Sequence, residues 1–258
     1  MTTATEGAAA PDFVTVGEGA NGRRVAVRAR QANAQGGRAP GLFWLSGFNS
    51  DMAGTKAVAL DAWAAEHGRG CVRFDYSGHG CSEGRFVDGT IGRWLEEALA
   101  VFDRYCKGPT VAVGSSMGGW IALLVAEARP ERIAAFVGIA AAPDFTDWGF
   151  SQADKMTLLA DGRLERPSDY GAPLVTTRGF WQSGEGLRML HREIALDCPV
   201  RLLHGQRDAD VPWHHSTHLA GKLRSADVQT ILVKDGDHRL SRPQDLDLLI
   251  ATVASLPV

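Results

Sequence analysis

This sequence has few cysteines and no large excess of positive or negative charge. The 258 residues include four cysteines with no Cys-x-x-Cys pair, at positions 71, 81, 106 and 198. This spacing argues against a disulfide framework and predicts reduced, mostly buried thiols. A formal net charge of −3 provides no global basic field that would attract nucleic acid or an acidic membrane surface. We therefore expect a small neutral or weakly charged substrate rather than a nucleic acid.

Long apolar runs are also missing. Gly, Arg, Asp and Glu interrupt each apolar stretch before it reaches the roughly 18 residues of a membrane-spanning helix, so no span is predicted. The first residues, MTTATEGAAAPDF, lack the basic start and apolar run of a secretory signal. They also lack the Arg-rich amphipathic pattern of an organelle presequence. A cytoplasmic protein is the expectation from these features.

What the sequence does contain is a regular alternation of apolar runs and amphipathic stretches. Six buried strands are predicted at residues 42–45, 72–74, 111–114, 134–139, 200–204 and 228–233. Apolar residues at three-to-four spacing predict helices at residues 55–67, 91–106, 117–128 and 213–223. A hairpin around Asn21-Gly22 precedes them. This order predicts an α/β fold with a doubly wound, mainly parallel sheet.

The length and the 45% apolar content suit one substantial core, so residues 1–258 are expected to form a single domain. The alternation stops between Asp144 and Asp197, over a stretch far longer than an ordinary connection. We interpret residues 144–197 as a cap inserted in this domain. Most of its large apolar side chains are expected to cover the sheet, and Trp148, Phe180 and Trp181 are candidates for substrate contact.

A Gly-x-Ser-x-Gly motif carries the strongest chemical signal. Residues 111–120 read VAVGSSMGGW, an apolar strand that passes through Ser116 directly into a helix. A serine on so sharp a turn is exposed as a nucleophile, and Gly114 and Gly118 remove Cβ atoms that would collide across it. The chain has 30 glycines, so the motif could arise by chance, but the flanking strand and helix favour catalysis.

Two backbone amides are candidates for an oxyanion hole. The predicted helix after Ser116 begins at Met117, so the Met117 N–H is expected to point toward the negative charge that develops on the substrate oxygen. The second donor is expected from the loop after residues 42–45, where the Phe48 N–H follows Gly47. The Asp75 carboxylate lies in another turn-rich strand exit, and we expect it to stabilise that loop.

A serine hydroxyl needs a base, and His238 is well placed, since it follows the last predicted strand and precedes the C-terminal helix. Asp208 follows the strand before that, which gives the order Ser, Asp, His expected of this kind of fold. Asp210 and Asp144 remain alternatives for the acid.

The other histidines have weaker claims, with His79 in a Gly-rich turn and His204 at a strand end. The i, i+4 spacing of His214 and His218 resembles a metal-ligand pair, but no third ligand supports it, so we expect no metal.

Several segments resemble those of one branch of the α/β hydrolases. They are GF at 47–48 through GTKA at 54–57, RFDYSG at 73–78, GSSMGGW at 114–120, RLLHG at 201–205 and VPWH at 211–214. The branch is the α/β-hydrolase domain-containing protein 10 group, whose animal members are mitochondrial palmitoyl-protein thioesterases and acyl-glucuronide esterases. The chain resembles a bacterial relative of this group. The resemblance implies an eight-stranded sheet with one antiparallel strand, a small helical cap after the sixth strand, and Ser116, Asp208 and His238 as nucleophile, acid and base.

The sequence therefore predicts a serine hydrolase that cleaves carboxylic esters or thioesters through an acyl-enzyme, with no metal or organic cofactor. The apolar cap favours a medium or long acyl chain, and Arg178 or Arg188 is a candidate partner for an acidic leaving group. Alternatives are a carbon–carbon bond hydrolase or a cofactor-free haloperoxidase on the same triad, or a non-catalytic receptor with this fold. The sequence leaves acyl length, thioester against oxygen ester, and oligomeric state open.

Overall fold

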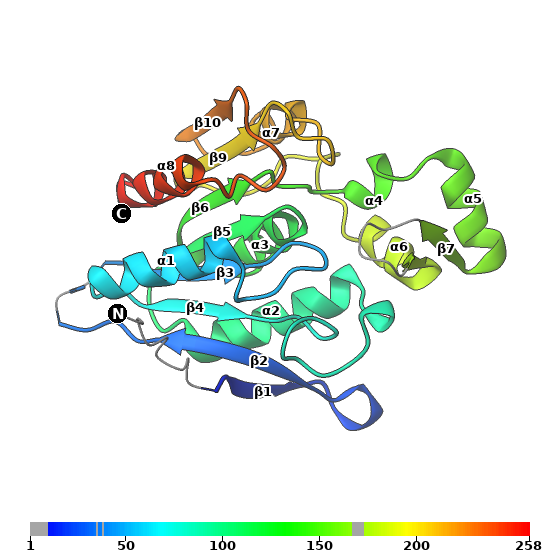
Figure 1. Ribbon diagram of the computed structural model, residues 1–258, viewed down its shortest axis with the longest axis horizontal. Coiled ribbons are helices and arrows are strands. Elements are labelled where there is room, and N and C mark those ends of the chain that lie inside the picture. Colours follow the sequence, from blue (N-terminus) through cyan, green and yellow to red (C-terminus); the bar gives the residue numbers. More distant parts are fainter. Residues whose placement is uncertain (1–9, 35, 38, 167–172) are drawn as a thin grey trace, which may run out of the picture.

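A mixed sheet of eight strands runs through the computed structural model, which describes residues 10–34, 36–37, 39–166 and 173–258 (Figure 1). The strands are β1 (Asp12–Val16), β2 (Arg23–Arg30), β3 (Gly41–Leu45), β4 (Cys71–Phe74), β5 (Thr110–Ser115), β6 (Ile133–Ile139), β9 (Val200–Gly205) and β10 (Val228–Val233). Their spatial order is β1-β2-β4-β3-β5-β6-β9-β10. β2 is antiparallel to both of its neighbours, and all other pairs are parallel. The predicted eight-stranded sheet with one antiparallel strand is confirmed.

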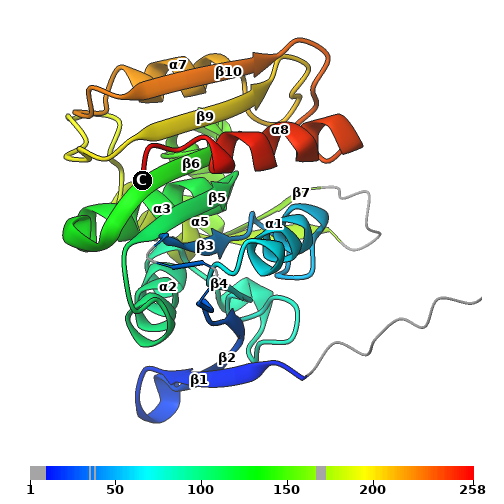
Figure 2. The same cartoon turned by 90° about the vertical axis from the view of Figure 1, so that its left-hand side faces the viewer.

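Helices cover both faces of this sheet. Figure 2 shows α1 (Thr55–Glu66) and α8 (Pro243–Ala254) on one face, with α2 (Ile91–Tyr105) and α3 (Met117–Ala128) on the other. A further helix, α7 (His214–Ala220), connects β9 to β10. None of the helices in the described ranges combines the length and the apolar character needed to cross a membrane.

Strand alternation explains how one sheet supplies two cores. In β3, Leu42 and Trp44 pack with the apolar residues of α1 and α8, whereas Phe43 and Leu45 pack with those of α2 and α3. Successive side chains of a strand point to opposite faces, so a strand covered on both sides is a continuous apolar run. This is why the central strands could be located from apolar runs alone.

The segment between β6 and β9 forms the cap. It consists of α4 (Phe145–Trp148), α5 (Gln152–Asp161), β7 (Arg163–Arg166), β8 (Leu174–Thr177) and α6 (Arg178–Glu185). Figure 1 shows it beyond the carboxyl ends of β5 and β6. The position after the sixth strand is as predicted. The antiparallel hairpin of β7 and β8 was not predicted, because most of its residues are partly or fully exposed and give no apolar run.

The four cysteines give a direct test of this packing. All are free thiols; Cys71 and Cys106 are buried, Cys198 is half-buried and Cys81 is exposed. Burial raises the pKa of Cys71 and of Cys106 to about 12, and that of Cys198 to about 11. Because the thiolate is the reactive form, we expect Ellman's reagent at pH 8 to modify Cys81 rapidly and the other three only after denaturation. Two or more rapidly reacting thiols in the native protein would contradict this arrangement.

Candidate active site

Ser116 occupies a strained turn between β5 and α3. Its backbone has φ 54° and ψ −121°, a conformation that L-residues rarely adopt. A Cβ atom on Gly114 would collide with the carbonyl of Gly118, and one on Gly118 would collide with the carbonyl of Leu45. The turn therefore closes only with glycine at both positions, and the Ser116 side chain is held above the end of the sheet.

The structure brings Ser116, His238 and Asp208 into one hydrogen-bonded line. The His238 Nε2 atom lies 3.1 Å from Ser116 Oγ, and its Nδ1 atom lies 2.7 Å from Asp208 Oδ2. Asp208 follows β9 and His238 follows β10, so the parallel strands deliver both residues to the same sheet edge. The side chain of His238 is 23% exposed, whereas that of Asp208 is fully buried.

Neither alternative acid occupies the position of Asp208. The Asp144 carboxylate accepts hydrogen bonds from the backbone amides of Met189 (2.9 Å) and Leu190 (2.8 Å). Asp144 therefore anchors the segment that leads from the end of the cap to β9, and its carboxylate does not face His238. Asp210 donates its backbone N–H to Asp208 Oδ1 at 2.9 Å and has an exposed side chain.

Asp208, Asp210 and His238 form the one group of three metal-ligand side chains found in the described residues, with ligand atoms within 4.8 Å of one another. Two of these three are already hydrogen-bonded to each other, and the third is exposed.

The surroundings of Asp208 favour its ionised form. Burial by itself would raise the pKa of Asp208, but hydrogen bonds from His204, His238 and the Val211 N–H outweigh it and hold the pKa far below its usual range. Oδ1 accepts the Asp210 and Val211 amides at 2.9 and 2.8 Å, and Oδ2 accepts from the two histidines. The carboxylate is thus a fixed anion directed at the His238 ring.

His204 is a residue of this site that the sequence did not reveal. Its ring is fully buried, with Nε2 3.1 Å from Asp208 Oδ2 and 2.9 Å from the Val211 carbonyl oxygen. Two acceptors at Nε2 require that this nitrogen carries the proton, so Nδ1 accepts from Ser216 Oγ at 2.6 Å. The one available signal was a polar residue at the end of a mainly apolar strand, four residues before Asp208.

The loop after β3 lies against the serine turn. A Cβ atom on Gly47 would lie 3.3 Å from the Ser115 carbonyl oxygen and 3.4 Å from the Ser116 Cβ atom, so the loop passes close to the serine turn. The N–H groups of Phe48 and Met117 donate no hydrogen bond to any other described residue. Both residues border the cavity at Ser116. Two unused backbone donors therefore belong to residues that line the same cavity as Ser116.

A cavity of about 220 Å³ opens between this site and the cap. Ser116, His238 and Asp210 are among its few polar lining residues. Its apolar lining comprises Phe48, Met117, Ala142, Phe145, Trp148, Phe150, Leu174, Phe180 and Val211. Arg166 and Thr176 of the cap also line it, but the lining is mainly apolar and suits a hydrocarbon chain whose reactive head lies at Ser116.

Two of the cap candidates line this cavity and three do not. Trp148 and Phe180 contribute to its wall. Trp181 instead donates its Nε1–H to the Thr146 carbonyl at 3.1 Å, and Arg178 donates to the Leu158 carbonyl at 3.0 Å. Arg188 forms ion pairs with Asp147 and Glu185, at 2.8 and 3.3 Å, within the cap.

The sheet order and the serine turn together define an α/β-hydrolase. A family model described as alpha/beta hydrolase fold matches residues 59–171. The chain is also 39% identical over 225 residues to the human mitochondrial palmitoyl-protein thioesterase ABHD10, and the match covers 85% of this chain and 74% of that protein. The chain belongs to the α/β-hydrolase family, as its sequence motifs implied.

The chain is also similar to solved structures of hydrolases. A hydrolase from Agrobacterium vitis S4 is 43% identical, with a TM-score of 0.89 and coverage of 95% of this chain and 97% of that one. The mouse α/β-hydrolase domain-containing protein 10 is 34% identical, with a TM-score of 0.84 and coverage of 94% and 97%. The resemblance to this group is confirmed, and with it the assignment as a hydrolase.

Proposed function

We propose that this protein is a serine hydrolase of carboxylic esters or thioesters, with Ser116 as nucleophile, His238 as general base and Asp208 as the orienting acid. The observation that carries the proposal is the unbroken line from Ser116 Oγ through the two ring nitrogens of His238 to Asp208 Oδ2. Because Asp208 accepts a hydrogen bond from the Nδ1–H group, the Nε2 atom of the neutral ring is unprotonated and faces the hydroxyl. A neutral imidazole in this tautomer is the base that a serine nucleophile requires.

Acylation follows from this geometry. Ser116 Oγ attacks the carbonyl carbon of the substrate as His238 Nε2 takes the hydroxyl proton, and the carbonyl oxygen becomes an oxyanion. The N–H groups of Phe48 and Met117 would donate to that oxygen. His238 then returns the proton to the leaving oxygen or sulfur as its bond to the acyl carbon breaks. Water repeats the sequence on the acyl-enzyme and releases the acid, with Asp208 ionised throughout.

The shape of the site supports an acyl substrate with a polar leaving group. The apolar cavity under the cap suits the acyl chain, in keeping with relatives that are named palmitoyl-protein thioesterases. On the other side of Ser116 a second cavity, of about 480 Å³, is lined largely by polar residues of the loops that follow β3 and β10. Lys56 and Arg239 line this second cavity, whereas Arg178 and Arg188 do not, and they would be the cations met by an acidic leaving group.

Labelling with a fluorophosphonate tests the nucleophile directly. We expect one covalent addition per chain in the intact mass, mapped by peptide sequencing to Ser116, and none in denatured protein, since reactivity depends on the folded triad. The same preparation should hydrolyse nitrophenyl esters and S-palmitoyl peptides. Labelling of another residue, or no labelling, would refute the assignment of Ser116. Labelling at Ser116 without ester or thioester turnover would instead favour carbon–carbon bond hydrolysis or haloperoxidase chemistry on the same triad.

A further inference from the structure

The loop after β3, which carries Phe48, is fastened to the loop after β4 at two points. Asp75 accepts the Met52 N–H at 2.6 Å on one carboxylate oxygen and the Cys81 N–H at 2.8 Å on the other. This confirms Asp75 as a loop-stabilising residue. The second point is nearer the active site, where the Asn49 N–H donates to His79 Nε2 at 3.2 Å. Asn49 directly follows Phe48, so this bond acts on the peptide next to the Phe48 amide.

The partners of His79 fix its proton. The Asn49 N–H is a donor, so Nε2 accepts, and the proton of the neutral ring lies on Nδ1, which is 3.3 Å from the Ser77 carbonyl oxygen. The residue is 5% exposed, and burial lowers the pKa of His79. The neutral ring with a proton on Nδ1 is therefore the form that satisfies both partners.

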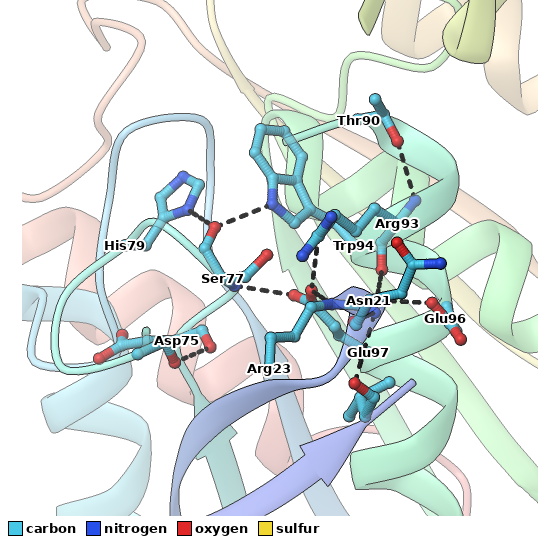
Figure 3. A network of polar contacts seen from close by, with 12 residues as sticks. Asn21, Arg23, Asp75, Ser77, His79, Thr90, Arg93, Trp94, Glu96 and Glu97 are labelled. Carbon is cyan, nitrogen blue, oxygen red and sulfur yellow. Dashed lines mark hydrogen bonds and ion pairs between the residues drawn. The ribbon is translucent and has the colours of Figure 1, made fainter. Parts of the chain in front are cut away.

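A buried polar network holds His79 in this orientation, as Figure 3 shows. The Ser77 carbonyl that accepts from His79 also accepts the Trp94 Nε1–H at 3.1 Å. The Ser77 N–H donates at 2.8 Å to Glu97, a fully buried carboxylate that is paired with Arg23. Strand β2 and helix α2 thus anchor the loop after β4. Through its bond with Asn49, His79 connects this anchored loop to the loop that carries Phe48.

We propose that His79 is a positioning residue for oxyanion stabilisation, which holds the Phe48 N–H toward the reacting carbonyl through its hydrogen bond from Asn49. The inference rests on the proposed function. Asn49 has a φ of 56°, in the left-handed region, so the chain turns sharply just after Phe48. Loss of the acceptor at Nε2 leaves the Asn49 N–H unpaired and frees this turn to relax. An oxyanion donor works only when it is aimed in advance at the position of the oxyanion.

Aromatic packing is the competing explanation for His79. Its ring contacts Phe86 and Trp94 with centroids 5.0 Å away in each case, and the Phe48 ring contacts the same two side chains at 4.8 and 5.9 Å. Two substitutions separate the roles. His79→Phe keeps a ring but removes the acceptor, whereas His79→Gln loses the ring but keeps an acceptor oxygen near the position of Nε2.

Steady-state kinetics provide the test. The concentration of active sites is measured by complete titration with a fluorophosphonate, and kcat is expressed per active site. In His79→Phe we expect kcat on a nitrophenyl ester to fall about 10- to 100-fold with KM nearly unchanged, a loss smaller than the roughly 10²- to 10³-fold cost of deleting an oxyanion donor. The Ki of a trifluoromethyl ketone, which forms a tetrahedral adduct, should rise in parallel. His79→Gln should recover most of kcat. A purely structural role would lower melting temperature and the titrated fraction without changing kcat per site.

The proposal is overturned if His79→Phe keeps kcat per titrated site within twofold of wild type, or if His79→Gln loses as much as His79→Phe. An inactive, unlabelled wild type would instead refute the proposed function itself. If His79→Phe does not fold, long-range ¹H–¹⁵N spectra of the wild-type protein decide the matter. They should show His79 protonated on Nδ1 and unprotonated on Nε2, and the opposite tautomer would exclude the bond from Asn49.

Discussion

Ser116→Ala is expected to lower kcat on nitrophenyl esters by on the order of 10⁶ and to abolish fluorophosphonate labelling. The methyl group of alanine cannot form the acyl bond, so the histidine and the carboxylate have no nucleophile to activate. Residual turnover would come only from water attacking a carbonyl polarised by the Phe48 and Met117 amides. Circular dichroism should be unchanged, because one hydroxyl is removed from a turn whose shape is fixed by its glycines.

The neighbouring serine provides a matched control. Ser115 is the last residue of β5 and is mostly buried, and its hydroxyl has no bond to His238. Ser115→Ala makes the same chemical change one residue earlier and should keep kcat within a few-fold of wild type. Full turnover in Ser116→Ala, or equal losses in both variants, would show that the reaction does not pass through the Ser116 hydroxyl.

The strands and the serine turn could be predicted because each is encoded locally. The central strands are covered by helices on both faces and are therefore apolar along their length, as at Val111 to Val113. The turn at Ser116 requires glycine at two fixed positions, so this backbone constraint can be recognised in the sequence. His238 and Asp208 could be selected because parallel strands present their following loops at one edge.

Residues that act through tertiary contacts with the backbone escaped prediction. His79 meets the Asn49 amide, and His204 meets the Val211 carbonyl, and no side-chain pattern marks such partners in advance. The cap raised a related difficulty. Phe180 lines the cavity and its neighbour Trp181 does not, because adjacent positions on a helix face directions about 100° apart. The sequence shows which residues are apolar but does not show which of them face the cavity once the helix packs.

Asp208→Asn is expected to lower kcat by about 10⁴-fold while leaving the fold intact. The Asp210 and Val211 amides both donate to Oδ1, so they would orient the asparagine oxygen toward themselves. The new NH₂ group would then occupy the Oδ2 position and direct its hydrogens at the His238 ring. His238 Nδ1 would have to accept, which moves the ring proton to Nε2, where it faces Ser116 and cannot take the hydroxyl proton.

Asp210→Asn separates this effect from a general loss of negative charge at the site. The bond from Asp210 to Asp208 is made by its backbone N–H, which the substitution retains, so kcat should fall less than about tenfold. The two variants carry the same change of charge two residues apart, and steady-state assays with thermal melts for both give the comparison. Near-wild-type kcat in Asp208→Asn, with a large loss in Asp210→Asn, would assign the acid to Asp210 and require the loop after β9 to rearrange during catalysis.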